Sequence, residues 1–163
     1  MSAVDITKDI DNATLIVTTV FAAAPERVWE LWADPRQLER WWGPEPYPAT
    51  VVDHDLRPGG HVSYYMTSPD GEQLKGYWHV LEVDAPHHLR LEDGFADADG
   101  APNEELPVSR FVVTIERVDD ERARMTMTAV YETSGDLEKV LAMGMEEGIR
   151  TAVEQSHSLL AEG

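Results

Sequence analysis

The C-terminal end of the chain carries the feature that most restricts its fold. Apolar residues recur from Leu137 to Leu160 with the period of an α-helix, and charged residues such as Glu138, Glu146, Glu147, Arg150 and Glu154 lie between them. We therefore predict one continuous helix over about residues 136–160. Because so amphipathic a helix is not stable alone, it must bury its stripe against a large apolar surface. The stripe consists of Leu137, Val140, Leu141, Met145, Ile149, Ala152, Val153, Leu159 and Leu160, with Gly144, Gly148 and Ser156 between them.

The N-terminal part predicts a strand followed by two short helices. Thr14–Phe21 is a β-branched and aromatic run, as strands favour. Pro25 suits the first position of a helix. Asp34 and Pro35 then end that helix and begin a second, with Gln37 three residues after Asp34 as a capping box requires. The second helix is expected to end near residues 41–44.

The middle of the chain predicts strands separated by turns. Two turn signals, Pro58-Gly59-Gly60 and Pro69-Asp70-Gly71, bracket a strand at His61–Thr67. Further strands are predicted at residues 74–84, 88–92, 108–118 and 123–132, the last two with clear alternation of apolar residues. Apolar residues occupy both parities of residues 77–83, so the parity that faces the interior stays open.

These elements together indicate an α+β fold. We expect a curved antiparallel sheet of six to seven strands around the long C-terminal helix, enclosing an apolar space. Residues 1–163 are expected to form a single domain, with residues 1–12 as an N-terminal tail.

Composition excludes several classes of partner and chemistry. The net charge of −18 would repel phosphate backbones and anionic lipid, so neither nucleic acid nor a membrane is expected as a partner. The absence of cysteine removes disulfides, thiolate nucleophiles and thiolate metal sites, which fits a cytoplasmic protein. Residues 1–12 lack the basic and apolar regions of a signal peptide.

Several strings of the sequence resemble those of a known family. The order of elements is similar to the START-like helix-grip superfamily, also called SRPBCC or Bet v 1-like. The strings narrow this to the family that resembles the C-terminal domain of the activator of the Hsp90 ATPase, over residues 14–160. They are Ala24-Pro25 with Val28-Trp29, Trp41-Trp42-Gly43-Pro44, Asp55-Leu56-Arg57-Pro58-Gly59-Gly60, Pro69-Asp70-Gly71 and Glu82-Val83-Asp84-Ala85-Pro86.

The resemblance implies a cavity that holds a small hydrophobic or amphipathic molecule between the sheet and the C-terminal helix. Strand parity and helix register add the residues expected to bind it, with Trp42 and Phe95 near the mouth. Gly148 would leave room for the molecule, although its alternative role is close packing of helix on sheet. The predicted ligand-binding residues are Trp42, Tyr64, Met66, Phe95, Met127, Met145, Gly148 and Ile149.

Two features set this chain apart within the resemblance. Ile149 occupies a position where the family often carries tryptophan, so the cavity floor is expected to differ. Residues 93–107 are acidic, small or turn-forming, and they are too many for a simple hairpin turn. We predict a mobile flap beside the cavity mouth; the alternative is a solvated excursion with Phe95 buried in the core.

No motif for catalysis, a metal or a cofactor is recognisable, and none of these is expected. No serine has the flanking glycines of a nucleophile elbow, and no glycine-rich loop suits phosphate. His54 and His61 could approach each other across a hairpin as a zinc or proton-transfer pair. Two alternatives to plain ligand binding stay open. One is a cyclase- or aromatase-like enzyme using Tyr64, His79 or Tyr131; the other is activation of an Hsp90-type ATPase, with a chaperone protein as partner.

Overall fold

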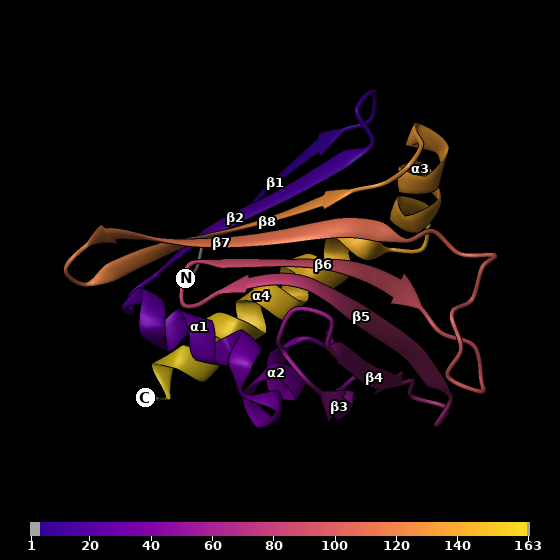
Figure 1. Cartoon of the computed structure of the whole chain (residues 1–163), viewed down its shortest axis with the longest axis horizontal. Helices are drawn as coiled ribbons and strands as arrows, with labels where there is room; N and C mark the ends of the chain where they lie inside the picture. Colours follow the sequence, from indigo (N-terminus) through magenta and orange to yellow (C-terminus); the bar gives the residue numbers. More distant parts are fainter. Residues whose placement is uncertain (1–3, 163) are drawn as a thin grey trace.

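The computed structural model describes residues 4–162 of the protein. The chain folds into a single antiparallel sheet with helices packed against it (Figure 1). Its eight strands follow the order β1-β2-β8-β7-β6-β5-β4-β3. The α+β class is therefore confirmed, whereas the expected count of six to seven strands is wrong. The strands are β1 (Val4–Asp9), β2 (Thr14–Phe21), β3 (Ala49–His54), β4 (His61–Thr67), β5 (Gln73–Asp84), β6 (His88–Phe95), β7 (Ser109–Asp119) and β8 (Arg122–Val130).

The extra strand, β1, comes from residues expected to form a tail. It pairs with β2 in register from Val4 with Thr19 to Asp9 with Thr14. Its sequence is mostly polar because it lies at the edge of the sheet, where charged side chains protect unpaired backbone groups. Lys8 Nζ also lies 2.7 Å from Glu146 Oε1 and ties this edge to the C-terminal helix.

The two short helices form where the sequence predicts them, as α1 (Pro25–Ala33) and α2 (Pro35–Trp41). Asp34 caps α2 because its side chain accepts a hydrogen bond from the backbone N–H of Arg36 at 2.9 Å. The Gln37 amide donates to the Asp34 carboxylate at 3.1 Å rather than to the backbone, so the predicted capping box is replaced by a side-chain pair. Both helices cover one end of the sheet (Figure 1).

The C-terminal segment is two helices instead of the predicted single one. α3 spans Ser134–Ala142 and α4 spans Met145–Ala161. Gly144, between them, has φ of +91°, a left-handed conformation that ends α3 and that glycine adopts without steric cost. The apolar stripe appears unbroken in sequence because each helix buries its own part of it, Leu137 and Val140 from α3 and Ala152 and Val153 from α4.

A bulge in β5 resolves the open parity of residues 77–83. The pairing of β5 with β6 shifts register between Val80 and Glu82. Trp78 and Val80 face the helices and are fully buried; past the bulge, Val83 pairs with the buried Leu89. Apolar residues thus occupy both parities because the extra residue, Leu81, changes the alternation midway along the strand.

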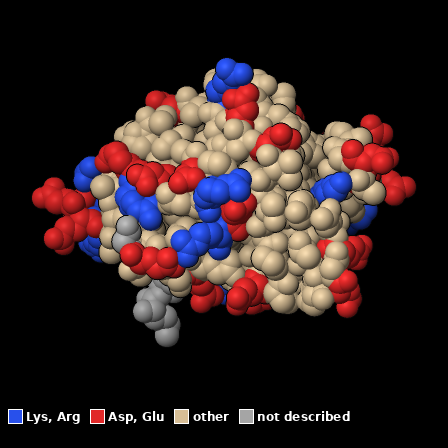
Figure 2. Space-filling view, turned by 90° about the horizontal axis from the view of Figure 1, so that it is seen from below, with Lys and Arg blue, Asp and Glu red and all other residues tan. Residues whose placement is uncertain are grey.

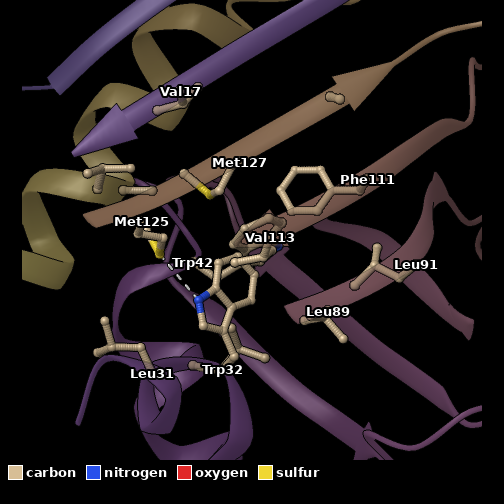
Figure 3. Close-up of a cluster of buried hydrophobic side chains, with 14 of the residues drawn as sticks. Val17, Leu31, Trp32, Trp42, Leu89, Leu91, Phe111, Val113, Met125 and Met127 are labelled. Atoms are coloured by element: carbon tan, nitrogen blue, oxygen red, sulfur yellow. Dashed lines mark hydrogen bonds between the residues drawn. The ribbon is translucent and has the colours of Figure 1, made fainter. Parts of the chain in front are cut away.

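An aromatic cluster fills the interior beneath α1 and α2 (Figure 3). Trp32 and Trp42 lie edge to face with their ring centroids 5.7 Å apart, and Trp42 makes a similar pair with Trp78 at 5.1 Å. The indole N–H of Trp32 donates to Met125 Sδ at 3.4 Å, the dashed line in Figure 3. Large rings packed in this manner leave no space at this end of the interior.

Acidic side chains are spread over the surface, with basic ones interspersed, on the face shown in Figure 2. Many of the basic groups belong to exposed ion pairs such as Arg40 with Glu162 at 2.8 Å. Within the described part of the chain, no helix has both the length and the apolar character needed to cross a membrane.

Candidate functional site

A cavity of about 270 Å³ lies between the inner face of the sheet and the two C-terminal helices. Strands β2, β4, β6, β7 and β8 supply one wall, and α3, α4 and the turn between them supply the other. Its lining is Leu15, Val17, Trp42, Pro44, Tyr64, Met66, Asp93, Gly94, Phe95, Pro107, Ser109, Phe111, Met127, Ala129, Tyr131, Val140, Met143, Gly144, Met145, Gly148, Ile149 and Ala152. Almost all of these residues present apolar atoms.

All eight residues predicted to bind a ligand line this cavity, and their binding of a ligand stays a prediction. Strand register explains how two of these residues meet, because Tyr64 pairs with Gly76 and Gly76 with Phe95 in one row across the sheet. Gly76 is required there: a Cβ atom would approach the Tyr64 ring to 2.5 Å. Gly148 has only Pro44 within 4 Å of such an atom, so this part of α4 borders open space.

Trp42 lies at the packed end of the cavity rather than near its mouth, where it was expected. Its side chain is only 7% exposed because α2 delivers it into the aromatic cluster. Met143, which is 54% exposed, and the exposed Gly144 lie instead where the cavity reaches the surface, at the α3–α4 turn.

The sequence-based site missed Asp93, the one acidic residue of the lining. Its Oδ1 atom lies 3.5 Å from the Tyr64 hydroxyl, which donates to it. Asp93 follows Leu89 and Leu91 at a period of two, and these inner-face leucines are fully buried. The predicted strand ended at Glu92, whereas β6 continues to Phe95. Extending the alternation by one step would have found the residue.

Burial controls the ionisation of the groups around Asp93. Removal from water raises the pKa of Asp93 to about 7, although the hydroxyl of Tyr64 and the indole of Trp78 oppose the shift. Burial, followed by the charge of Asp93, also raises the pKa of Tyr64 well above its usual value. The same two causes raise the pKa of Tyr131, whose hydroxyl donates to Met145 Sδ at 3.5 Å. Both phenols therefore stay protonated at neutral pH.

The other residues considered for chemistry are not gathered at this site. His79 is exposed and lies outside the cavity lining, so it is wrong as a candidate within the cavity. His54 Nε2 lies 2.9 Å from the carbonyl oxygen of Trp32, and His61 stacks against Tyr77, so the two histidines do not form the conceived pair. Within residues 4–162, no group of three or more His, Asp or Glu residues is placed to hold a metal ion.

The loop between β6 and β7 lies at the same end of the sheet as α3 (Figure 1). Lys139 of α3 donates to the carbonyl oxygen of Glu105 at 2.9 Å, and Lys75 donates to that of Ala98 at 2.7 Å. Phe95 and Pro107, at the two ends of the loop, both line the cavity. The loop is thus placed beside the opening, while its mobility stays a prediction.

Comparisons with solved structures agree with this architecture. The chain is 50% identical to protein Ms6760 from Mycobacterium smegmatis, with 97% of each chain covered and a TM-score of 0.89. A protein from Arthrobacter aurescens is 43% identical, with 98% of this chain and 92% of that chain covered and a TM-score of 0.93. The AHSA1 protein from Silicibacter pomeroyi is 25% identical over 91% of this chain and 98% of its own, with a TM-score of 0.73. No curated protein matches the chain.

The family model described as "Activator of Hsp90 ATPase homolog 1-like protein" matches residues 22–161. This span includes both short helices, six of the eight strands as wholes and both C-terminal helices. The chain therefore belongs to the family of activator of Hsp90 ATPase homolog 1-like proteins.

Proposed function

We propose that the protein binds a small hydrophobic or amphipathic molecule in the cavity between the sheet and the C-terminal helices. The observation that carries this proposal is a space of about 270 Å³, walled by apolar side chains and left unfilled beside a tightly packed core. Protein interiors normally leave few voids larger than a water molecule. An apolar cavity of about 150 Å³ holds one benzene ring with room to spare, so a molecule of two or three rings suits this volume.

Some of the residues proposed to bind the molecule would fit its shape, and others would form polar contacts with it. Met66, Met127 and Met145 supply flexible walls that adapt to varied apolar shapes. Tyr64 supplies a hydroxyl that fixes orientation, as the few polar groups of apolar sites usually do. Gly148 keeps the α4 wall open.

Filling the cavity from α4 tests the proposal. Gly148→Leu adds a side chain at a position bordered within 4 Å only by Pro44, so we expect the fold to tolerate it. Binding of the uncharged probe N-phenyl-1-naphthylamine, followed by its fluorescence, should weaken about tenfold or more, because the new side chain occupies about the volume of half a probe. Gly135→Leu adds the same side chain at an exposed position of α3 and should leave binding unchanged. A folded Gly148→Leu protein that binds the probe as tightly as the parent would contradict the proposal.

A second candidate function, acid–base catalysis on the bound molecule, is favoured by Asp93. A carboxyl group with a pKa of about 7 inside an apolar cavity can give or take a proton at neutral pH. Native mass spectrometry of protein purified from its own organism would identify a retained molecule. If Asp93 is catalytic, the parent and Asp93→Asn proteins should retain different compounds, related as product and substrate; the same compound in both would speak against catalysis.

The remaining proposals rest on sequence. We propose that residues 1–163 act as one domain and that the protein is cytoplasmic, because it is acidic and free of cysteine. Activation of an Hsp90-type ATPase rests on the description of the family alone.

A further inference from the structure

One corner of the cavity is polar, and Asp93 lies at its centre. Among residues 4–162, no lysine, arginine or histidine lines the cavity, so none of these side chains neutralises the carboxylate there. From β4, Tyr64 donates to Asp93, and from β7 the buried Ser109 is its partner in the strand register. Tyr131 faces the corner from the end of β8. The α4 residues of the lining, Met145, Gly148, Ile149 and Ala152, carry no titratable group.

Two buried donors at this corner lack partners. The indole N–H groups of Trp42 and Trp78 form no hydrogen bond among the described residues. Both N–H groups lie near enough to Tyr64 to lower its pKa, which burial raises, and the N–H of Trp78 also lowers the pKa of Asp93. Their geometry falls short of a hydrogen bond. Buried donors are normally paired, and an orphaned one in a native structure calls for an explanation.

The corner therefore holds more donors than acceptors when Asp93 carries a proton. Tyr64 and Tyr131 keep their protons at neutral pH, and in this structure they donate them to Asp93 and to Met145 Sδ. The two indoles only donate, and a neutral Asp93 carboxyl adds one more O–H. The contact of Tyr64 with Asp93 is long at 3.5 Å, so the Tyr64 hydroxyl can turn to a ligand oxygen. A neutral carboxylic acid and a tyrosine hydroxyl in an apolar site are a known pair of donors to a ligand oxygen, as in ketosteroid isomerase. The group missing from this corner is an acceptor.

We propose that Tyr64 and protonated Asp93 bind the carbonyl oxygen of an uncharged, largely apolar ketone or ester of about two rings. This inference rests on the proposed function and specifies the class of molecule. Of the two orphaned indoles, Trp42 lines the cavity, so its N–H adds a further donor beside Tyr64.

A basic amine is the competing ligand, because a carboxylate among aromatic rings is also a site for cations. Cations bind to ring faces. Here Trp42 meets both Tyr64 and Trp78 edge to face, at 85° and 89°, and its N–H edge is the part that influences the Tyr64 hydroxyl. The positive edges of rings and their N–H donors repel an ammonium group, so the carbonyl ligand fits the corner better.

Three naphthalenes of similar shape separate these ligands in calorimetric titrations of the full chain. They are 2-acetylnaphthalene, 2-isopropylnaphthalene and 1-(2-naphthyl)ethylamine. We expect Tyr64→Phe to weaken binding of the ketone about tenfold at pH 6 while changing that of the hydrocarbon less than about twofold, since only the ketone loses a donor. Tyr77→Phe, which removes a hydroxyl from the outer face of β5, should change neither.

The pH dependence gives a second readout that a merely structural role would not produce. Affinity for the ketone should fall about tenfold between pH 6 and pH 8.5, because Asp93 loses the proton that it donates. Asp93→Asn should remove this dependence, whereas Glu92→Gln, on the outer face of the same strand, should retain it. The carbonyl stretch of bound 2-acetylnaphthalene should also lie at lower frequency in the parent than in Tyr64→Phe.

The outcomes distinguish a failure of this inference from a failure of the proposed function, which is binding of an apolar molecule in the cavity. Equal effects of Tyr64→Phe on the ketone and the hydrocarbon would overturn the inference and leave the cavity as a binding site. An amine that binds more tightly as the pH rises from 6 to 8.5, with no such effect of pH on the ketone, would also overturn it. If none of the three naphthalenes binds the parent protein, both the inference and the proposed function are wrong.

Discussion

The two ends of the interior are covered by different helices, and only one end is filled. Beneath α1 and α2, Trp32, Trp41 and Trp78 are fully buried and pack ring against ring. Beneath the α3–α4 turn, the same sheet faces Gly144, Gly148 and flexible methionines, and a cavity of about 270 Å³ remains. The sheet alone therefore does not decide where the hollow lies. The position of the hollow depends on which side chains the helices pack against the sheet.

Truncating the packed end should have the largest effect. Trp32→Ala removes a fully buried indole that packs against four other aromatic rings and Met125, so the free energy of unfolding should fall by about 4 kcal/mol. Denaturant unfolding measures this change. Trp29→Ala, on the partly exposed side of the same helix, is the matched control and should cost far less. A loss under about 1 kcal/mol for Trp32→Ala would mean that the two ends do not differ in packing as described.

The cavity end should make the free energy of unfolding depend on pH, because Asp93 lies there. The pKa of Asp93 is about 7 in the folded protein against 3.8 for an unperturbed carboxyl, so the folded state binds more protons than the unfolded chain between these values. The contribution of Asp93 to the free energy of unfolding is therefore present below about pH 4 and is lost as the pH rises from about 4 to 7. A shift of this size corresponds to at most about 4 kcal/mol, and access of water to the cavity reduces it.

Asp93→Asn should remove that penalty. We expect the substitution to raise the free energy of unfolding by about 2 kcal/mol more at pH 8 than at pH 4, measured by denaturant unfolding across the range. Glu92→Gln should alter the pH profile far less. A profile for Asp93→Asn that parallels the parent would show that the carboxyl group is solvated and that the hollow end is not apolar.

Gly144 tests the break between the two helices. Gly144→Ala places a Cβ atom in open space but on a backbone with φ of +91°, so we expect a loss of about 1 kcal/mol from the backbone alone. Gly135→Ala, within α3 at ordinary φ, should instead gain a few tenths of a kcal/mol from helix propensity. If Gly144→Ala stabilised the protein to the same degree, the segment would be one continuous helix after all.

The smallest effect concerns the loop of residues 96–108. Amide hydrogen exchange of residues 94–106 should slow when N-phenyl-1-naphthylamine binds, because Phe95 and Pro107 border both the loop and the cavity. Residues of α1 at the packed end serve as the internal reference and should not change. Fast exchange that is the same with and without the probe would make the loop a solvated excursion instead of a flap.

Most of the fold was predictable because local patterns specify it. A β-branched and aromatic run placed β2, alternation placed β7 and β8, and Pro25 and Pro35 marked the starts of α1 and α2. The failures have physical reasons as well. β1 is polar because it is an edge strand, so it lacks the apolar alternation that marks its neighbours. The break at Gly144 leaves the apolar period intact, so the stripe alone could not reveal it.

The candidate site was predicted in its walls but not in its polar corner. Strand parity and helix period put Tyr64, Met127 and Ile149 on inner faces, which is a local property of sequence. Asp93 was assigned to a loop because residues 93–107 are mainly acidic, small or turn-forming. Its inward position depends on the pairing of β6 with β5 and β7, which involves residues distant in the chain.

The sequence by itself determined most of the elements, their order and the faces that they bury, since these depend on neighbours within a few residues; the edge strand β1 and the break at Gly144 are the exceptions. Only the tertiary structure decided that the tryptophans of α1, α2 and β5 gather at one end while glycines and methionines meet the sheet at the other. It also decided that one carboxyl group lies among aromatic rings with a pKa of about 7. A cavity and a shifted pKa are properties of what surrounds a residue in space, and those surroundings come from chain segments far apart in sequence.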